Sequence, residues 1–481
     1  MNRQIRRVGI ALMALFLALF LQLNYLQLYR GDSLANDPRN TRAAVRDFSR
    51  PRGQIVAADG AVLARSIDVD SQFERLREYP EGELFAHLTG FFSFTYGATG
   101  IERRYNDELA GRDLGIGSLK DIVVDRTITG DVFLTVSKQL QTVARDALGQ
   151  QRGSVVAIDA TNGSVLAMWS FPSYDPNALS QHSQKGVQEA WQLLNAAPTR
   201  PLLGRAYQET FAPGSTFKVI TSAAALERAP ELATKAYPPL KELDLPRTNR
   251  NLPNFGGGTC GGTLPDLLRV SCNTGFGQMG IDMGAQALVD EARDFGFDSR
   301  PPLDLTAVRA SAIPNADAFD RNEPALAYSA IGQQDVRSTP LQMALVAAGI
   351  ANNGVIMQPH LMAEVHDSEG DVVRRYEPRP WKTATSPEAA GQLRELMINV
   401  VENGTGTRAK VPGAVVGGKT GTAQTQGDNA HAWFMGFGEV GEKRVAVAVI
   451  VESQEGLSEA TGGRVAAPIA QAVLRAALGV G

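Results

Sequence analysis

The most regular hydrophobic pattern lies at the N-terminus. The 21 residues from Val8 to Leu28 carry no formal charge, and a helix of about 20 apolar residues spans a bilayer. Three arginines precede this run: Arg3, Arg6 and Arg7. Because positive charge favours the cytoplasmic side of a membrane, residues 1–7 are predicted to be a cytoplasmic tail and residues 8–28 a transmembrane anchor. The rest of the chain is then predicted to lie outside the cell membrane.

Two other structures could produce this apolar run. A cleaved secretory signal has a shorter apolar region of about 7–15 residues and a small-residue cleavage site, for which Ser33-Leu34-Ala35 is a poor match. A helix buried in a protein core is also disfavoured, because the run is long and directly follows the arginines. We therefore expect a single-pass membrane protein with its N-terminus in the cytoplasm.

After the anchor, the pattern changes to short apolar runs separated by turn residues. Residues 29–140 are polar, and Arg52-Gly53-Gln54-Ile55 and Asp59-Gly60 separate the short runs. Such runs between glycine-containing turns are typical of short strands. A small β-rich module is predicted here.

Longer elements follow from about residue 150. Two apolar runs, 154–159 and 165–169, are separated by a turn and predict a β-hairpin. Helical spacing is found after Ser215, and further apolar patterns predict a helix over 341–351, a buried strand over 444–451 and a helix over 465–478. Strands mixed with flanking helices predict an α/β fold for a second domain, residues 141–481.

Composition narrows the possible functions. The 481 residues are 43% hydrophobic and 20% charged, which is typical of globular domains, and the net charge of −4 gives no reason to expect nucleic-acid binding. The five histidines and two cysteines show no metal-ligand spacing. We expect neither a metal nor a cofactor.

The first element that carries chemistry is Pro213-Gly214-Ser215-Thr216-Phe217-Lys218, which opens a predicted helix. Ser215 falls near the helix N-terminus, and Lys218, three positions on, lies beside it on the same face. Serine needs a base to become a nucleophile, and a lysine kept neutral by burial and nearby positive charge can act as that base. On its own, Ser-x-x-Lys arises by chance about once in a chain of this composition.

Two further elements follow. Ser271-Cys272-Asn273 taken alone is compatible with an ordinary loop or helix cap, whereas Lys419-Thr420-Gly421 occurs once in the chain and continues into Thr422. Side chains alternate along a strand, so Lys419 and Thr420 can serve one groove only if their strand is a sheet edge beside it. Gly421 is predicted to let a substrate backbone approach that edge.

In this order, the three elements resemble the motif set of penicillin-binding proteins and class A β-lactamases. The resemblance covers about residues 40–475, and further stretches match the family: residues 153–177, 332–333, 339–344, 402–406 and 431–436. Upstream, Arg52–Ile55 and Gly100-Ile101-Glu102 resemble the non-catalytic module of class B enzymes. The chain is most similar to the actinobacterial type called penicillin-binding protein A.

The resemblance implies a transpeptidase domain with a central antiparallel sheet flanked by helices, following a pedestal-like or dimerisation-like module. It also implies a serine D,D-transpeptidase that cross-links peptidoglycan stem peptides through an acyl-enzyme and is inhibited by β-lactams. The implied catalytic residues are Ser215, Lys218, Ser271, Asn273 and Lys419, and the implied substrate-binding residues are Thr420, Gly421 and Thr422. A membrane glycosyltransferase and division or elongation proteins are the implied partners.

Three other functions were weighed. Residues 413–420 satisfy the pattern of a nucleotide-binding P-loop, but they lack the preceding buried strand and the following helix that such a loop needs. A β-lactamase would place its serine soon after a cleaved signal, whereas Ser215 lies far beyond the anchor. A penicilloyl receptor or division scaffold that signals without turnover remains open, although seven residues before Val8 leave no room for a cytoplasmic effector.

The two cysteines lie outside the cytoplasm in this topology, where disulfides persist. Cys260 and Cys272 are 12 positions apart, and Cys272 lies inside the Ser-x-Asn element. A bridge between them is predicted to tie the lip of the groove to the segment that holds Ser271 and Asn273. The alternative is two separate buried thiols.

Overall fold

The computed structural model describes residues 2–28, 48–71, 73–111, 129–424, 430–453 and 461–480. Parts of the predicted module, residues 29–47 and 112–128, lie outside the described residues. The chain divides into two units, one comprising Met1–Pro51 and Ile67–Leu76 and the other Arg52–Ser66 and Arg77–Gly481. The second unit contains every predicted site residue.

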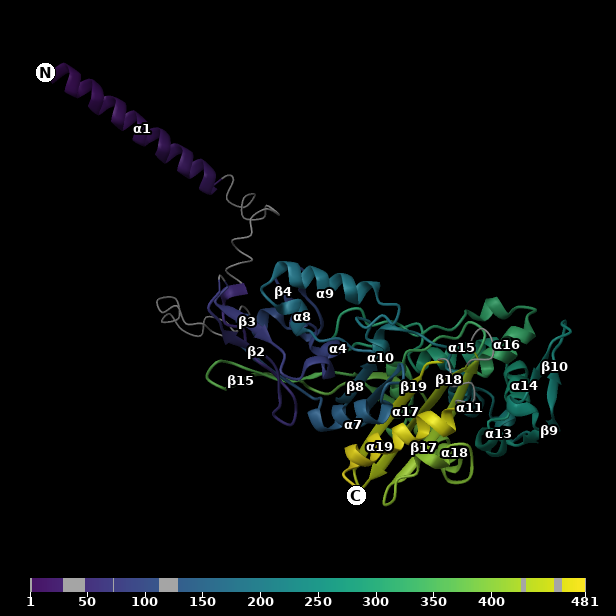
Figure 1. Ribbon diagram of the computed structural model, residues 1–481. Helices are drawn as coiled ribbons and strands as arrows, with labels where there is room; N and C mark the ends of the chain where they lie inside the picture. The colour runs from purple at the N-terminus through teal and green to yellow at the C-terminus, as the bar shows by residue number, and fades with distance from the viewer. Residues whose placement is uncertain are drawn as a thin grey trace. The chain divides into compact units, whose positions relative to one another are not determined.

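The first helix, α1 (Asn2–Leu28), includes the predicted anchor (Figure 1). Its segment Arg3–Tyr25 is long and apolar enough to cross a membrane. Large side chains such as Met13 and Phe16 are about 70% exposed, at 71% and 69%. This exposure fits a helix surrounded by lipid, so a single-pass anchor agrees with the structure.

The core of the second unit is a five-stranded antiparallel sheet in the order β17-β18-β19-β7-β8. Its strands are β7 (Gly153–Asp159), β8 (Val165–Phe171), β17 (Val415–Gln424), β18 (Ala430–Val440) and β19 (Lys443–Val451). All seven residues from Val445 to Val451 are buried. A run that is apolar at consecutive positions suits a central strand covered on both faces.

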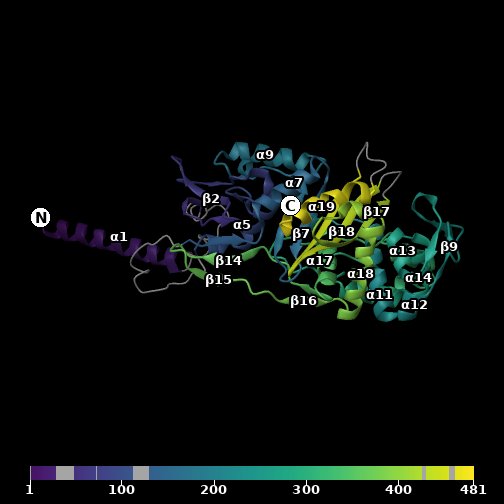
Figure 2. The same cartoon turned by 90° about the horizontal axis from the view of Figure 1, so that it is seen from below.

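Two pairs of helices cover this sheet (Figure 2). One pair is α17 (Pro340–Ala351) with α18 (Pro387–Asn403), and the other is α7 (Lys138–Leu148) with α19 (Ala467–Leu478). Every residue of α17 is buried, as its nearly continuous apolar sequence requires. β17 forms one edge of the sheet, so its outer side is available to line a groove.

A largely helical region adjoins β17. Its helices are α11 (Lys218–Arg228), α12 (Pro230–Thr234), α13 (Leu264–Val270), α14 (Asn273–Met283), α15 (Ala285–Asp294) and α16 (Glu323–Ala330). Short strands β9 (Tyr237–Leu240), β10 (Glu242–Asp244), β11 (Asn251–Pro253) and β12 (Cys260–Gly262) form two small sheets beside α14. Tyr237, Leu252 and Phe276 belong to the separate hydrophobic core of this region.

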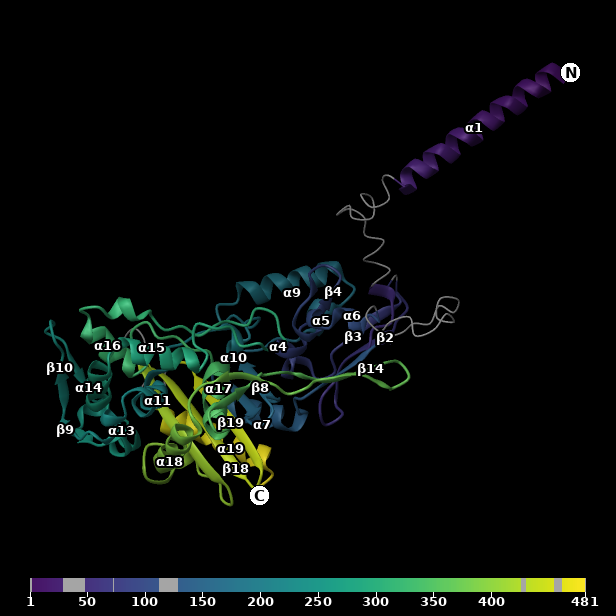
Figure 3. The same ribbon diagram turned by 180° about the vertical axis from the view of Figure 1, so that it is seen from behind.

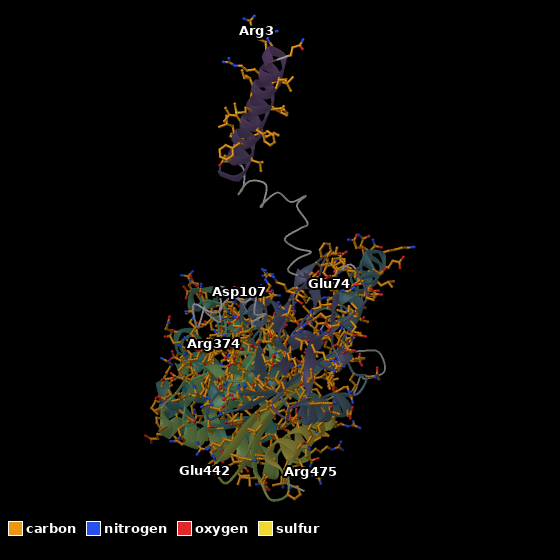
Figure 4. All side chains as sticks on the ribbon, turned by 90° about the vertical axis from the view of Figure 1, so that its left-hand side faces the viewer. Arg3, Glu74, Asp107, Arg374, Glu442 and Arg475 are labelled. Carbon is orange, nitrogen blue, oxygen red and sulfur yellow. A yellow bond between two sulfur atoms is a disulfide. The ribbon has the colours of Figure 1, made fainter. Side chains whose placement is uncertain are left out.

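The N-terminal module contains a six-stranded sheet in the order β15-β14-β6-β1-β2-β3. Its strands are β1 (Ile55–Val56), β2 (Val62–Asp68), β3 (Arg75–Glu78), β6 (Asp131–Leu134), β14 (Met362–His366) and β15 (Val372–Arg375). The hairpin β14-β15 therefore comes from the middle of the predicted second domain (Figure 3). It pairs with β6. Arg374, which is labelled in Figure 4, forms an ion pair with Glu108 of the module.

The other α-helices and β-strands are short, apart from one helix of 13 residues. They are α4 (Ala86–Thr89), β4 (Phe92–Ser93), β5 (Gly97–Ala98), α5 (Gly100–Arg104), α6 (Asn106–Leu109), α8 (Asn177–Ser180), α9 (Gln184–Ala196), α10 (Arg205–Gln208), β13 (Val355–Met357) and β16 (Pro380–Thr383). A single π-helical turn, Gly462–Ala466, precedes α19.

The secondary structure follows the predicted pattern closely. The predicted hairpin appears as β7 and β8, and the strand predicted over 444–451 is β19. The helices predicted over 341–351 and 465–478 are α17 and α19, and the mixed α/β fold is confirmed.

Candidate active site

Ser215 lies in a tight 3₁₀ turn, Gly214–Phe217, that leads directly into α11. The turn begins at Gly214, whose φ of +54° favours glycine. The backbone N–H of Gly214 donates to the carbonyl of Gly332 at 2.9 Å. A Cβ at Gly332 would lie only 2.2 Å from the carbonyl oxygen of Gly214, so residue 332 must be glycine for this loop to support the serine turn.

Lys218 is completely buried, one helical turn after Ser215. Its Nζ donates to the carbonyl oxygen of Ser271 and to Oδ1 of Asn273, each at 2.7 Å. A third contact, at 3.3 Å, joins Nζ to the Ser271 hydroxyl. A neutral amine has two N–H groups, which the two short bonds satisfy, so its lone pair remains available to accept a proton.

The electrostatic surroundings of Lys218 favour this neutral form. Burial lowers the pKa of Lys218 well below the usual value for lysine, and the nearby charge of Lys419 lowers it further. No carboxylate forms an ion pair with Lys218 among the residues that the structure describes. Lys218 therefore has the burial and the hydrogen bonds expected of a general base.

Ser271 and Asn273 are placed by the junction of two helices. Ser271 caps the C-terminus of α13 with a left-handed backbone, at φ +61°, and Asn273 begins α14. Nδ2 of Asn273 donates to the carbonyl of Pro253 at 2.9 Å. A left-handed conformation is unusual for serine and is typical of positions held for function.

A disulfide joins Cys260 of β12 to Cys272, with their Cα atoms 5.8 Å apart. This separation lies within the ordinary range for disulfides. Cys272 stands between Ser271 and Asn273, so the bridge ties both residues to the strand that lines the other side of the cavity.

Lys419, Thr420 and Thr422 lie on the edge strand β17. Lys419 is fully buried, and its Nζ donates to the carbonyl of Thr420 at 2.9 Å. Burial lowers the pKa of Lys419 to about 7. The hydroxyls of Thr420 and Thr405 are 2.6 Å apart.

Gly421 has a structural role that the sequence did not indicate. A Cβ at this position would lie 3.0 Å from the carbonyl oxygen of Pro213, from Cγ2 of Thr216 and from Cβ of Trp433. The missing side chain lets β17 pack closely against the turn that carries Ser215. The close approach at Gly421 is thus made by this chain's own turn.

A cavity of about 940 Å³ joins these elements. Ser215, Ser271, Asn273, Thr420 and Thr422 line it. Lys218 and Lys419 lie buried behind its wall, and Gly421 faces the Ser215 turn.

The cavity also has lining residues that the sequence analysis did not assign. They include polar or charged side chains from helices and from the segments between them: Arg269, Tyr328, Gln333, Thr405, Thr407, Arg408 and Arg464. Gln333 and Thr405 fall within the stretches 332–333 and 402–406, which match the family. The sequence therefore marked both residues but assigned neither of them a function. Among the described residues, no group of three or more histidine, cysteine, aspartate or glutamate side chains could hold a metal ion.

Comparison with known proteins identifies the fold. Residues 153–475 match the penicillin binding protein transpeptidase domain, and residues 52–131 match the penicillin binding protein A dimerisation domain. The chain belongs to the penicillin-binding protein transpeptidase family. The prediction of a class B member of the A type is confirmed.

Individual relatives agree over nearly the whole chain. The peptidoglycan D,D-transpeptidase PbpA of Mycolicibacterium smegmatis is 39% identical, with 99% of each chain covered. PbpA of Mycobacterium tuberculosis is also 39% identical, again over 99% of each chain. The structure of a penicillin G acyl-enzyme complex of penicillin-binding protein A from M. tuberculosis superposes with a TM-score of 0.82 at 39% identity, covering 89% of this chain and 100% of that chain.

The nucleotide-binding interpretation of residues 413–420 is excluded. Lys419 and Thr420 lie within β17, which continues to Gln424. A P-loop requires a helix to begin at this position, because its N-terminal amides hold the phosphates.

Proposed function

We propose that this chain is a serine D,D-transpeptidase that cross-links peptidoglycan stem peptides, with Ser215 as its nucleophile. One observation carries the assignment of the base. The amine of Lys218 is buried, has a lowered pKa and is held by two acceptors one turn from the serine. The relatives are named peptidoglycan D,D-transpeptidases, and a solved relative is an acyl-enzyme with penicillin G.

The acylation step begins when Ser215 Oγ attacks the carbonyl carbon of the penultimate D-alanine. Lys218 accepts the hydroxyl proton as the new C–O bond forms. Backbone amides of Ser215 and Thr422 stabilise the oxyanion, where each donor contributes about 3 kcal/mol. The C–N bond then breaks, and the terminal D-alanine leaves with a proton that Ser271 relays to its amine.

Deacylation follows the steps of acylation in reverse, with the amine of a second stem peptide in place of the terminal D-alanine. The amino group of a neighbouring stem attacks the ester carbonyl and gives up a proton to Lys218. A C–N bond forms, the C–O bond to Ser215 breaks, and the Ser215 oxygen takes the proton from Lys218. Asn273 holds Lys218 and the substrate amide in this scheme, and Lys419 supplies positive potential. The hydroxyls of Thr420 and Thr422 bind the terminal carboxylate of the donor.

The location and architecture complete the proposal. Residues 1–7 lie in the cytoplasm, residues 8–28 anchor the chain, residues 29–140 form a non-catalytic module, and residues 141–481 form the transpeptidase domain. A membrane glycosyltransferase supplies the glycan strands, and division or elongation proteins direct the enzyme.

The topology can be tested with a reporter protein fused after Gly481. A reporter that functions only after export should be active. Activity of a reporter that functions only in the cytoplasm would contradict this topology.

The decisive experiment is intact mass measurement after incubation with penicillin. Ring opening expels no leaving group, so the wild-type mass should increase by one whole penicillin, and Ser215→Ala should gain nothing. The adduct should persist, because a transpeptidase has no device to activate water. Rapid turnover to free penicilloate would instead support the β-lactamase interpretation. A stable adduct with no cross-linking of stem peptides would support the receptor.

A further inference from the structure

Thr405 occupies a position in the groove that the family motifs do not explain. It lies in the short connection between α18 and β17, and its side chain is exposed at the cavity. Its hydroxyl oxygen lies 2.6 Å from that of Thr420, whose side chain is almost fully buried. The shortness of this contact makes it a well-formed hydrogen bond between hydroxyls.

The direction of this hydrogen bond decides what Thr420 can do. Each hydroxyl has one proton to donate. If Thr420 donated to Thr405, it would have no proton for a ligand. If Thr405 donates instead, the proton of Thr420 is free to point into the cavity, and the accepted bond also polarises its O–H.

The backbone of the same connection contacts two other segments that line the cavity, α13 and the turn before α19. The N–H of Thr405 donates to the carbonyl of Arg269, two residues before Ser271, at 3.3 Å. The chain approaches α13 so closely at Gly404 that a Cβ there would lie 2.4 Å from the same carbonyl oxygen. On the other side, a Cβ at Gly463 would lie 2.6 Å from the carbonyl oxygen of Thr405. The backbone holds Thr405 in place independently of its hydroxyl.

The charge at this end of the cavity suits an anion. Arg408 follows in the same connection, and its Nη1 donates to the carbonyl of Arg464 at 3.4 Å. Arg269, Arg408 and Arg464 all line the cavity, and Asp266 is the acidic side chain among the described lining residues. The surplus of arginine fits a ligand whose end is a carboxylate.

We propose that Thr405 is a positioning residue for the donor substrate. By donating to Thr420, its hydroxyl keeps the Thr420 O–H directed at the terminal carboxylate of a D-alanyl-D-alanine stem or at the carboxylate of a β-lactam. This inference rests on the proposed function, because it assigns a partner to a residue of that same site. Thr405 need not touch the substrate itself.

The test compares acylation by an anionic and a neutral form of one inhibitor. Full-length protein in detergent is incubated with benzylpenicillin or with its uncharged methyl ester, and the acylation rate constant is measured by intact mass. Thr405→Val removes the hydroxyl and preserves the shape. It should slow acylation by benzylpenicillin about tenfold, because the Thr420 O–H loses the donor that orients it toward the carboxylate. The ester has no carboxylate, so its rate should stay within about twofold of wild type.

Two further variants separate positioning from structure. Thr405→Ser keeps the hydroxyl and should acylate with benzylpenicillin within about threefold of wild type. Thr383→Val is the control, because Thr383 is an exposed threonine of β16 that is not among the residues lining the cavity. It should react with both inhibitors at the wild-type rate. If Thr405→Val does not fold, Thr405→Ala should show the same selective loss.

The outcomes are distinct. Equal losses with benzylpenicillin and the ester, no loss with either, or a Thr405→Ser protein as slow as Thr405→Val would each overturn the inference. If wild-type protein forms no adduct on Ser215, the proposed function itself fails. If the wild-type protein forms the adduct and Thr405→Val forms it at the same rate, only the role assigned to Thr405 is contradicted.

Discussion

The N-terminal module and the catalytic groove both bury charged side chains, but they surround them differently. In the module, both carboxylate oxygens of Glu102 bind arginines, Arg52 and Arg77, at 2.6 Å each. In the groove, Lys218 and Lys419 contact carbonyl, amide and hydroxyl oxygens. Within the described part of the chain, no carboxylate pairs with either lysine.

The pKa values reflect this difference. Burial alone would raise the pKa of Glu102, but the charges of Arg77 and Arg52 outweigh it, so the pKa lies below its usual value. Burial lowers the pKa of Lys218 and brings that of Lys419 to about 7. Pairing preserves charge and holds segments together, whereas burial without a carboxylate prepares an amine to exchange a proton.

The largest effect should come from removing the groove amine. Lys218→Met should slow acylation by penicillin about 10²–10⁴-fold, since the general base is lost. Its thermal unfolding midpoint should stay close to that of wild type, because the loss of the hydrogen bonds to Ser271 and Asn273 is offset by removal of a buried, desolvated amine. The rate is measured by intact mass and the midpoint by circular dichroism. Normal acylation would remove Lys218 from the mechanism.

Removing a buried carboxylate from the module should lower the stability of the protein and leave its acylation rate unchanged. Glu102→Gln leaves Arg52 and Arg77 without their carboxylate and should destabilise the folded protein by about 3–5 kcal/mol. The folded fraction should still acylate at the wild-type rate. Glu78→Gln, which breaks the partly exposed pair with Arg65, is the control and should have little effect.

Acid should erase the effect of Glu102→Gln. The pKa of Glu102 is lower in the folded protein than the ordinary value of 4.5. The stability that its charge contributes is therefore present above about pH 4.5 and is lost as the pH falls through the folded pKa. Melting curves of both proteins should converge in this range. A constant difference at all pH values would show that the carboxylate's charge is irrelevant.

The disulfide tests how firmly one wall of the groove must be held. Replacing both Cys260 and Cys272 by serine should destabilise the protein by about 3 kcal/mol, the value expected for a loop of this length. Acylation should slow as well, since Ser271 and Asn273 flank Cys272. Without reductant, alkylation of denatured wild-type protein should modify neither cysteine. Modification of both cysteines without reductant would show that the disulfide is absent.

The last test concerns the pH dependence of stability. The pKa of Lys419 is about 7 when folded and about 10.5 for free lysine. Between these values the unfolded chain binds more protons, so the contribution of Lys419 to stability rises with pH. Lys419→Met should therefore melt above wild type at pH 7, with the difference shrinking toward pH 10.5. A difference that does not vary with pH would contradict the lowered pKa.

Local sequence patterns were sufficient for much of this protein. The charge-free run Val8–Leu28 predicted the anchor helix from its length alone. The two apolar runs within 154–169, separated by a turn, predicted the hairpin β7-β8. Ser215 and Lys218 became neighbours through helical spacing alone. The order of the three motifs, together with the further stretches that match the family, was enough to identify the family.

Other features depended on contacts between residues distant in the chain. Nothing near 362–375 indicated that β14 and β15 would join the sheet of the N-terminal module, because strand pairing depends on a partner 230 residues away, at β6. The close packing of Gly421 against the serine turn and the hydrogen bond between Thr405 and Thr420 are of the same kind. Sequence periodicity records which face of an element is buried, but not which element covers it.

The properties of the catalytic residues also depend partly on the local sequence and partly on the tertiary structure. The sequence by itself determined which side chains were present and that a serine and a lysine would share one helical turn. Only the tertiary structure decided that Lys218 and Lys419 are fully buried beside oxygen acceptors with no carboxylate partner in the described residues. The physical reason is that desolvation, which lowers the pKa of an amine, is a property of everything packed around it and not of its neighbours in the chain.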